Sequence, residues 1–384
     1  MNTQRSHERN GGIELLRFLF TGIIIFFHIN LDLWNQKKIV AVIHSVPVTF
    51  FQHGNLGVEF FFLVSGYLMA ETVCRQNSAR SGSSASSLPR DTFDFVLHKA
   101  KAVFPCYLTA CALTPLVRLL TGKEVAAAYF IRRLPSLFFL QRLGLGRSFI
   151  GCSWYLSSLL ISLAAAYPLC RRFYRVYTHI LAPVLCAGLL ISIIALTGSL
   201  GDISDWFFFT YKTNIRAFAE LSMGAAAFEL SRSIRGRVRT SLSRCLLSLS
   251  AVICLALSLA YICSSADGKF GLIIFYLLFA VVVIVFSGEG MISRSRLFLA
   301  CRPLFYYLGR ISLPMYLTQT LMRRSVPFFF EKSSLWTQCF LIYAGTLTLG
   351  ILVSAVMDRS LRSRIAGLLT GRGRKVYEQQ APGI

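Results

Sequence analysis

The chain has 384 residues, of which 55% are hydrophobic and only 15% are charged, and its mean hydropathy is +0.59. This composition excludes a soluble globular protein of this length, because so apolar a surface fits a lipid bilayer and not water. The formal net charge of +23 would suggest nucleic-acid binding in a soluble protein. Here the apolar segments leave no soluble module for such a ligand, so we expect no nucleic-acid partner.

Membrane-spanning helices are the elements that the sequence predicts most clearly. Each needs about 20 mostly apolar residues, because every backbone polar group must be paired inside the segment. In chain order, we place ten spans at 13–33, 55–73, 96–120, 152–170, 180–200, 208–230, 245–264, 270–288, 303–323 and 335–357. Arg132, Arg133 and Pro135 interrupt the stretch 125–143, which we interpret as interfacial. The predicted fold class is therefore all-α, a polytopic membrane bundle of about ten transmembrane helices.

The distribution of cations predicts the topology. The spans form one domain, 13–357, between a short N-terminal tail, 1–12, and a basic C-terminal tail, 358–384. Lys and Arg are concentrated in both tails and in alternate connections, such as the cluster between Arg232 and Arg244. The positive-inside rule then places both termini in the cytoplasm. The first span is long and lacks an Ala-x-Ala-like cleavage site, so we expect it to remain as a membrane anchor.

Charged side chains inside the spans are the best candidates for function, because a charge in hydrocarbon costs several kcal/mol unless it faces a partner or a wet cavity. The first span contains Glu14, Arg17 and His28. Eleven residues separate Arg17 from His28, which puts both on one helix face and about 16 Å apart. Arg17 lies towards the cytoplasmic side and His28 beyond the midplane. The two side chains are therefore placed to hold the two ends of one long ligand.

Three further charged side chains lie inside the predicted spans. Glu59 in the second span is predicted at a depth similar to that of His28, where a carboxylate would orient the imidazole and raise its basicity. The structural alternative is that His28 is a satisfied core histidine and Glu59 a helix–helix hydrogen-bonding group. Arg216 and Glu220, one turn apart in the sixth span, fit either a binding role or a pair that neutralises itself.

Eleven cysteines are scattered through the apolar segments, without a Cys-x-x-Cys motif or a histidine spacing suited to a metal. We interpret them as small membrane hydrophobes and expect no metal site.

Several motifs together resemble acyltransferase family 3, the integral-membrane O-acyltransferases of bacteria. The resemblance extends from about residue 11 to 357 and rests on Glu14-Leu-Leu-Arg17 with His28, Gly57-Val-Glu-Phe-Phe-Phe-Leu-Val-Ser-Gly-Tyr67, Ser153-Trp-Tyr-Leu156 with Tyr167-Pro168, Arg216 with Glu220-Leu-Ser-Met-Gly224, and Leu308-Gly-Arg-Ile-Ser-Leu-Pro-Met-Tyr-Leu317. Three positions depart from the family pattern: Gln319 replaces a usual histidine, Ala102 a frequent arginine, and Leu159 a glutamate common in sugar-modifying members.

The resemblance implies transfer of an acyl group, commonly acetyl, from cytoplasmic acyl-CoA to a hydroxyl of a carbohydrate or lipid-linked glycan at the outer face of a bacterial cytoplasmic membrane. Cations at the cytoplasmic end would hold the polyanionic nucleotide of acetyl-CoA, namely Arg17, Lys99 and Lys101. His28 would act as general base or transient acyl carrier, with Glu59 fixing its tautomer. Acceptor contacts would come from Trp154, Arg216, Glu220 and Gln319.

Two alternatives belong to other classes. A transporter or flippase of a lipid-linked glycan or small polar solute would use the same polar stripe without bond chemistry. It would need a continuous polar path and some two-fold organisation, and the sequence shows no internal repeat. The other alternative is a structural partner in a polysaccharide export complex.

Overall fold

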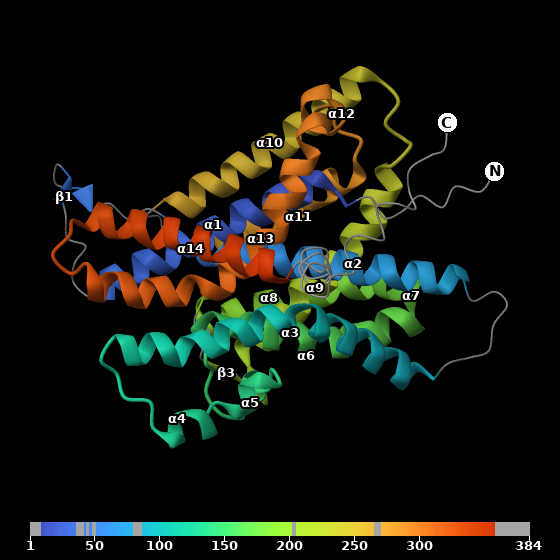
Figure 1. Cartoon of the computed structure of the whole chain (residues 1–384). Coiled ribbons are helices and arrows are strands. Elements are labelled where there is room, and N and C mark those ends of the chain that lie inside the picture. Colours follow the sequence, from blue (N-terminus) through green and yellow to red (C-terminus); the bar gives the residue numbers. More distant parts are fainter. Residues whose placement is uncertain are drawn as a thin grey trace, which may run out of the picture.

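The computed structural model describes residues 9–35, 42–43, 46–47, 51–79, 87–201, 205–264 and 270–357. These residues form ten long helices, one for each predicted span (Figure 1). The long helices are α1 (Gly11–Asn35), α2 (Gly57–Ala79), α3 (Leu88–Leu120), α6 (Trp154–Arg172), α8 (Ala182–Thr197), α9 (Lys212–Ile234), α10 (Ser241–Cys263), α11 (Gly271–Ser287), α13 (Arg296–Phe329) and α14 (Leu335–Met357). The predicted all-α fold of a polytopic membrane protein is confirmed.

Length and apolar composition alone identify eight of these helices as candidate membrane spans. The two others are α9 and α13, whose sequences carry polar and charged side chains. On α9 these include Arg216 and Glu220, and on α13 they include Gln319, all of them buried inside the protein. A helix that turns such groups towards a protein interior instead of lipid loses apolar character without losing its place in the bundle.

The connections are short helices and hairpins. They comprise η1 (Gly54–Leu56), α4 (Ala127–Ile131), α5 (Leu134–Leu137), η2 (Gln141–Leu143), η3 (Gly151–Ser153), α7 (Tyr174–Val176), the π-helix η4 (Tyr177–Leu181) and α12 (Met291–Arg294). Strands β1 (Val42–Ile43) and β2 (Val46–Pro47) form one antiparallel hairpin, and β3 (Trp206–Phe207) and β4 (Thr210–Tyr211) form another. The stretch predicted as interfacial contains α4, α5 and η2 and no long helix.

Two helices extend well beyond the predicted spans. Helix α3 begins at Leu88 and α13 runs from Arg296 to Phe329, because polar residues at their ends support a helix that hydropathy does not detect. The Ser295 side chain accepts a hydrogen bond from the Phe298 amide and thereby caps α13.

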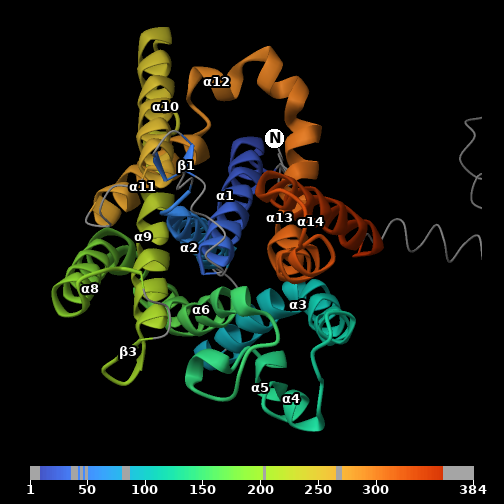
Figure 2. The same ribbon diagram turned by 90° about the vertical axis from the view of Figure 1, so that its left-hand side faces the viewer.

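A closed ring of helices surrounds the interior, in the order α1, α2, α9, α6, α3 and α13. Figure 2 shows α2 lying between α1 and α9, with α3 and α6 on the side away from α10 and α12. Helices α8, α10, α11 and α14 lie outside this ring. The ring is the part of the fold that positions the candidate site.

Small residues let the ring helices approach closely. A Cβ atom built on Gly66 of α2 would lie 1.8 Å from the carbonyl oxygen of Leu221 on α9, and one built on Gly224 would lie 2.1 Å from the carbonyl oxygen of Leu63. Glycine is therefore required on both sides of this crossing. The crossing brings Glu59 on α2 next to the polar face of α9.

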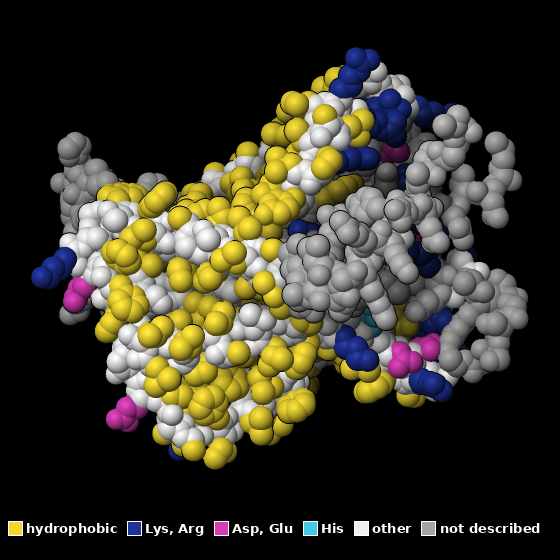
Figure 3. Space-filling model, in the orientation of Figure 1, with side chains coloured by type: hydrophobic (Ala, Val, Ile, Leu, Met, Phe, Trp, Pro, Cys, Tyr) yellow, Lys and Arg dark blue, Asp and Glu magenta, His cyan; other side chains and the backbone are white. Residues whose placement is uncertain are grey.

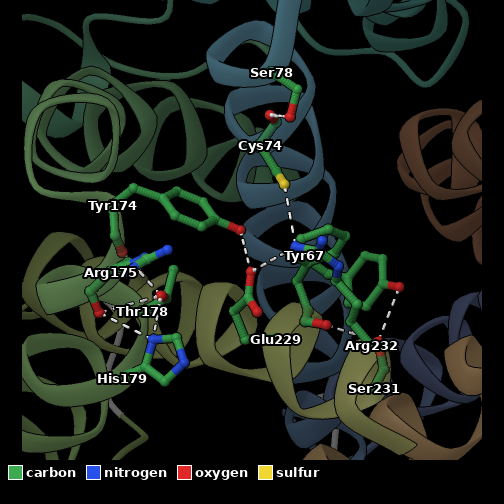
Figure 4. A network of polar contacts seen from close by, with 11 residues as sticks. Tyr67, Cys74, Ser78, Tyr174, Arg175, Thr178, His179, Glu229, Ser231 and Arg232 are labelled. Carbon is green, nitrogen blue, oxygen red and sulfur yellow. Dashed lines mark hydrogen bonds and ion pairs between the residues drawn. The ribbon is translucent and has the colours of Figure 1, made fainter. Parts of the chain in front are cut away.

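At one end of the ring, a polar network joins α2, α9 and α7 (Figure 4). The Tyr174 hydroxyl donates to Glu229, which also pairs with Arg232 at 3.6 Å. Arg232 in turn lies 3.5 Å from the Cys74 sulfur. These contacts fix the relative positions of the helix ends.

The outer surface is suited to lipid. Apolar side chains cover most of the face in Figure 3, whereas Lys and Arg side chains gather at the end of the bundle where α1 begins. Exposed apolar residues on α10 and α14 include Leu242, Leu246, Leu249, Phe340 and Leu352. This distribution matches a bilayer belt with a basic end.

Candidate active site

A cavity with a volume of about 770 Å³ lies inside the helix ring. We call it the His28 cavity. His28 and Asp32 of α1, Trp154 at the start of α6, Arg216 of α9 and Tyr316 of α13 belong to its lining. The structure thus brings three of the predicted site residues, His28, Trp154 and Arg216, to one chamber.

His28 is oriented by Gln319. The Nδ1 atom of His28 lies 2.9 Å from Oε1 of Gln319, and Nε2 of Gln319 donates to the Tyr316 carbonyl at 2.8 Å. Because the amide nitrogen must face that carbonyl, the amide oxygen must face His28, and Nδ1 must carry the ring proton. The lone pair then resides on Nε2. The free lone pair of a neutral imidazole in this tautomer therefore has a fixed direction.

The predicted pairing of Glu59 with His28 is wrong. Oε1 of Glu59 accepts a hydrogen bond of 2.8 Å from Arg216, and Arg216 also donates to Glu220 at 2.6 Å and to the Leu200 carbonyl at 2.9 Å. The guanidinium group is buried and has several donors, so it attracts both carboxylates. Of the two alternatives for Arg216 and Glu220, the ion pair is present and includes Glu59 as a third member. Arg216 also lines the His28 cavity, so its binding role stays a prediction.

A second cavity, of about 210 Å³, lies towards the start of α1, and we call it the Arg17 cavity. Arg17 and Lys99 line it, so two of the three predicted donor-binding cations lie together. Arg17 is also paired with Glu14 at 3.2 Å. Lys101 is exposed and lines neither the Arg17 cavity nor the His28 cavity.

The two cavities adjoin each other. Ile24 of α1, Val58 of α2 and Tyr316 of α13 line both of them. These side chains separate a cationic chamber from a chamber that contains an imidazole. A long, thin ligand that displaces them slightly would reach both.

Other predicted residues lie behind the chamber wall. Glu220 and Gln319 are fully buried and line neither cavity, and they contact Arg216 and His28, respectively. Trp154 lines the His28 cavity, and the Arg142 guanidinium lies 5.7 Å from its ring centroid. Arg142, which contacts this indole, was not among the predicted site residues.

Charged residues at the far end of the His28 cavity were also missed. Arg323 donates to both carboxylate oxygens of Asp32, at 2.6 and 2.7 Å, and Arg324 lines the cavity beside it. The sequence places these residues at the ends of spans, where charges ordinarily face water. Arginines accumulate at the ends of spans and in the interfacial stretch, where Arg118 and Arg133 add to Arg323 and Arg324. This accumulation was the signal that would have identified the region.

The residues that the structure describes contain no group of three or more His, Cys, Asp or Glu side chains suited to a metal ion. The geometry defines a helical membrane protein in which His28 lines an internal cavity.

A comparison with family models identifies the chemistry. A model described as an acyltransferase domain matches residues 10–359, nearly the whole chain. The protein therefore belongs to acyltransferase family 3, and it is a membrane acyltransferase that transfers acyl groups other than amino-acyl groups. No curated protein and no solved structure matches the chain significantly.

Proposed function

We propose that the protein transfers an acetyl group from cytoplasmic acetyl-CoA to a hydroxyl of a carbohydrate or lipid-linked glycan at the outer face of a bacterial cytoplasmic membrane. One observation carries this proposal: a cationic chamber and a histidine chamber meet at Ile24, Val58 and Tyr316. The proposal places the Arg17 cavity towards the cytoplasm, which the basic end of the bundle supports.

The donor fits the first chamber by charge and shape. Arg17 and Lys99 would bind phosphate groups of the nucleotide, and the exposed Lys101 would attract them from outside the cavity. The slender pantetheine arm would pass between Ile24, Val58 and Tyr316. Its thioester would then enter the His28 cavity, about 16 Å along α1 from Arg17.

His28 would supply the chemistry through Nε2. As general base, it takes the proton of the acceptor hydroxyl while the hydroxyl oxygen attacks the thioester carbonyl. The carbon–sulfur bond breaks, and the imidazolium returns the proton to the departing thiolate. As acyl carrier, Nε2 would itself attack the thioester carbonyl, and the carbon–sulfur bond would break to release the CoA thiolate. The acceptor hydroxyl would then attack the acyl-imidazolium, the carbon–nitrogen bond would break, and the hydroxyl proton would pass to the thiolate. Both routes require the proton on Nδ1, where Gln319 holds it.

The remaining predicted residues serve the acceptor side in this proposal. Trp154 and Arg216 line the same cavity, where an aromatic ring and a guanidinium group would contact a sugar. Glu59 and Glu220 hold Arg216 in position and neutralise it. Glu59 is thus a positioning residue and has no contact with His28.

Radiolabelled acetyl-CoA tests the function. Purified protein in proteoliposomes receives the labelled donor on one side and envelope polysaccharide of the host on the other, and ester-bound label on the polysaccharide is measured. Incorporation of label supports acyl transfer. Transfer of glycan across the membrane without incorporation of label would favour the transporter reading instead.

A further inference from the structure

We propose that the acceptor carries an anionic group, a carboxylate or a phosphate, and that Arg324 binds this group inside the His28 cavity. This inference deepens the proposed function, because it names the class of acceptor. The binding site itself can be tested without any acyl transfer.

Among the described residues, Arg324 is the cation of the His28 cavity lining that has a hydrogen-bond donor without a partner. Its Nη1 atom is buried and has no hydrogen-bond partner there. The other lining cations are neutralised, since Arg216 pairs with Glu59 and Glu220, and Arg323 pairs with Asp32. Asp205, an acid of the same lining, pairs with Lys212 at 3.4 Å. Arg324 is half-buried, and a buried guanidinium nitrogen without a partner favours an oxyanion ligand, which provides both charge and acceptor atoms.

Further cations surround Arg324. The guanidinium groups of Arg118 and Arg133 lie 4.9 and 3.8 Å from the ring centroid of Tyr129, and both repel the charge of Arg324. Burial lowers the pKa of Arg133, which lies outside the membrane spans, and the nearby Arg118 lowers it further. A bound anion would relieve this repulsion, so the surrounding cations strengthen the site.

The position of Arg324 fits an acceptor and does not fit a lipid surface. Arg324 lines the same cavity as His28, and five residues of α13 separate it from Gln319, the partner of His28. This spacing corresponds to about 7.5 Å along the helix. A group bound there would hold a neighbouring hydroxyl near Nε2 of His28.

Binding of matched probes to the purified full-length protein in detergent tests the proposal. The first pair is a galacturonate hexamer and its full methyl ester, which differ in charge and share the same backbone. The second pair is farnesyl diphosphate and farnesol, which represent the phosphate of a lipid-linked glycan. We expect one charged probe to bind at least about 10-fold more tightly than its neutral partner. Which pair shows this difference distinguishes an acidic sugar from a lipid-linked phosphate.

Variants assign the effect to Arg324. Arg324→Gln should abolish the preference for the charged probe, whereas Arg324→Lys should retain part of it. Lys332→Gln removes an exposed cation that follows α13 at the same end of the bundle, and it should leave the preference unchanged. Thermal unfolding of each variant establishes that it is folded.

Equal binding of both members of both pairs would overturn the proposal, as would unchanged discrimination in folded Arg324→Gln. Because no acyl-CoA is present, these outcomes do not depend on acetyl transfer. If the protein binds the charged probes selectively but incorporates no label from acetyl-CoA, the proposed reaction is rejected and the anion-binding site stands.

Discussion

His28 and Gln319 are 291 positions apart in the sequence, yet Nδ1 of one lies 2.9 Å from Oε1 of the other. This contact joins α1 to α13 at the His28 cavity. The family resemblance predicts a histidine at position 319, and the glutamine there provides an acceptor for the Nδ1 proton. Gln319 is therefore the residue that sets the tautomer of His28 in this protein.

Gln319→Leu should lower the turnover number about 100-fold, because the imidazole loses the acceptor that fixes its tautomer. The Michaelis constant for acetyl-CoA should change little, since Gln319 lines neither cavity. Steady-state kinetics in proteoliposomes measure both quantities. Gln338→Leu is the matched control, because it removes a buried glutamine that binds backbone carbonyls near Phe330 and is remote from the site. Equal losses in both variants would contradict an orienting role.

Arg216→Met should destabilise the protein by about 3–5 kcal/mol, because it leaves Glu59 and Glu220 buried without a counter-charge. Neutralising both acids in the same chain, with Glu59→Gln and Glu220→Gln, should recover most of this loss. Unfolding in detergent, followed by tryptophan fluorescence, gives the comparison. A triple variant no more stable than Arg216→Met would indicate that the ion pairs are not the cause.

Gly66→Ala should lower the free energy of unfolding by about 3 kcal/mol, because its Cβ would meet the backbone of α9 at Leu221. Gly188 offers the opposite case. A Cβ there has no atom within 4 Å, so Gly188→Ala should stabilise α8 by about 1 kcal/mol. Parallel thermal unfolding measures both effects, and similar behaviour of the two variants would contradict the close α2–α9 crossing.

Val58→Trp should reduce acetyl transfer at least about 10-fold, because the indole fills the junction of the two cavities. Binding of adenosine 3′,5′-diphosphate, which lacks the pantetheine arm, should remain unchanged. Leu116→Trp places the same side chain at an exposed position of α3 and serves as control. Normal acetyl transfer by folded Val58→Trp would show that the donor arm does not pass this junction.

Hydrophobic runs predicted the helices because a bilayer imposes both length and composition on each span. The shared face of Arg17 and His28 also followed from helical geometry, and both side chains face internal cavities. The hydrogen-bond partner of His28 could not be predicted in the same way. The depth of two residues along their helices does not determine how each helix is rotated about its own axis. Glu59 does not meet His28, because α2 turns it towards Arg216.

The sequence could not predict ion pairs between helices that are far apart along the chain. Asp32 and Arg323 lie near the ends of spans, where each is an ordinary interfacial charge taken alone. Only the packing of α1 against α13 brings them together. The same packing turns Arg324 inward, so a cation at a span end becomes a lining residue of the cavity.

The most direct test of the central claim is ester-bound acetate on the surface glycans of the host, measured by NMR spectroscopy. A host strain without this protein is complemented with the native chain or with His28→Ala, at equal amounts of folded protein in the membrane. We expect the native chain to restore the ester and His28→Ala to reduce the rate of its formation about 10²- to 10⁴-fold. Full restoration of the ester by His28→Ala would contradict the account.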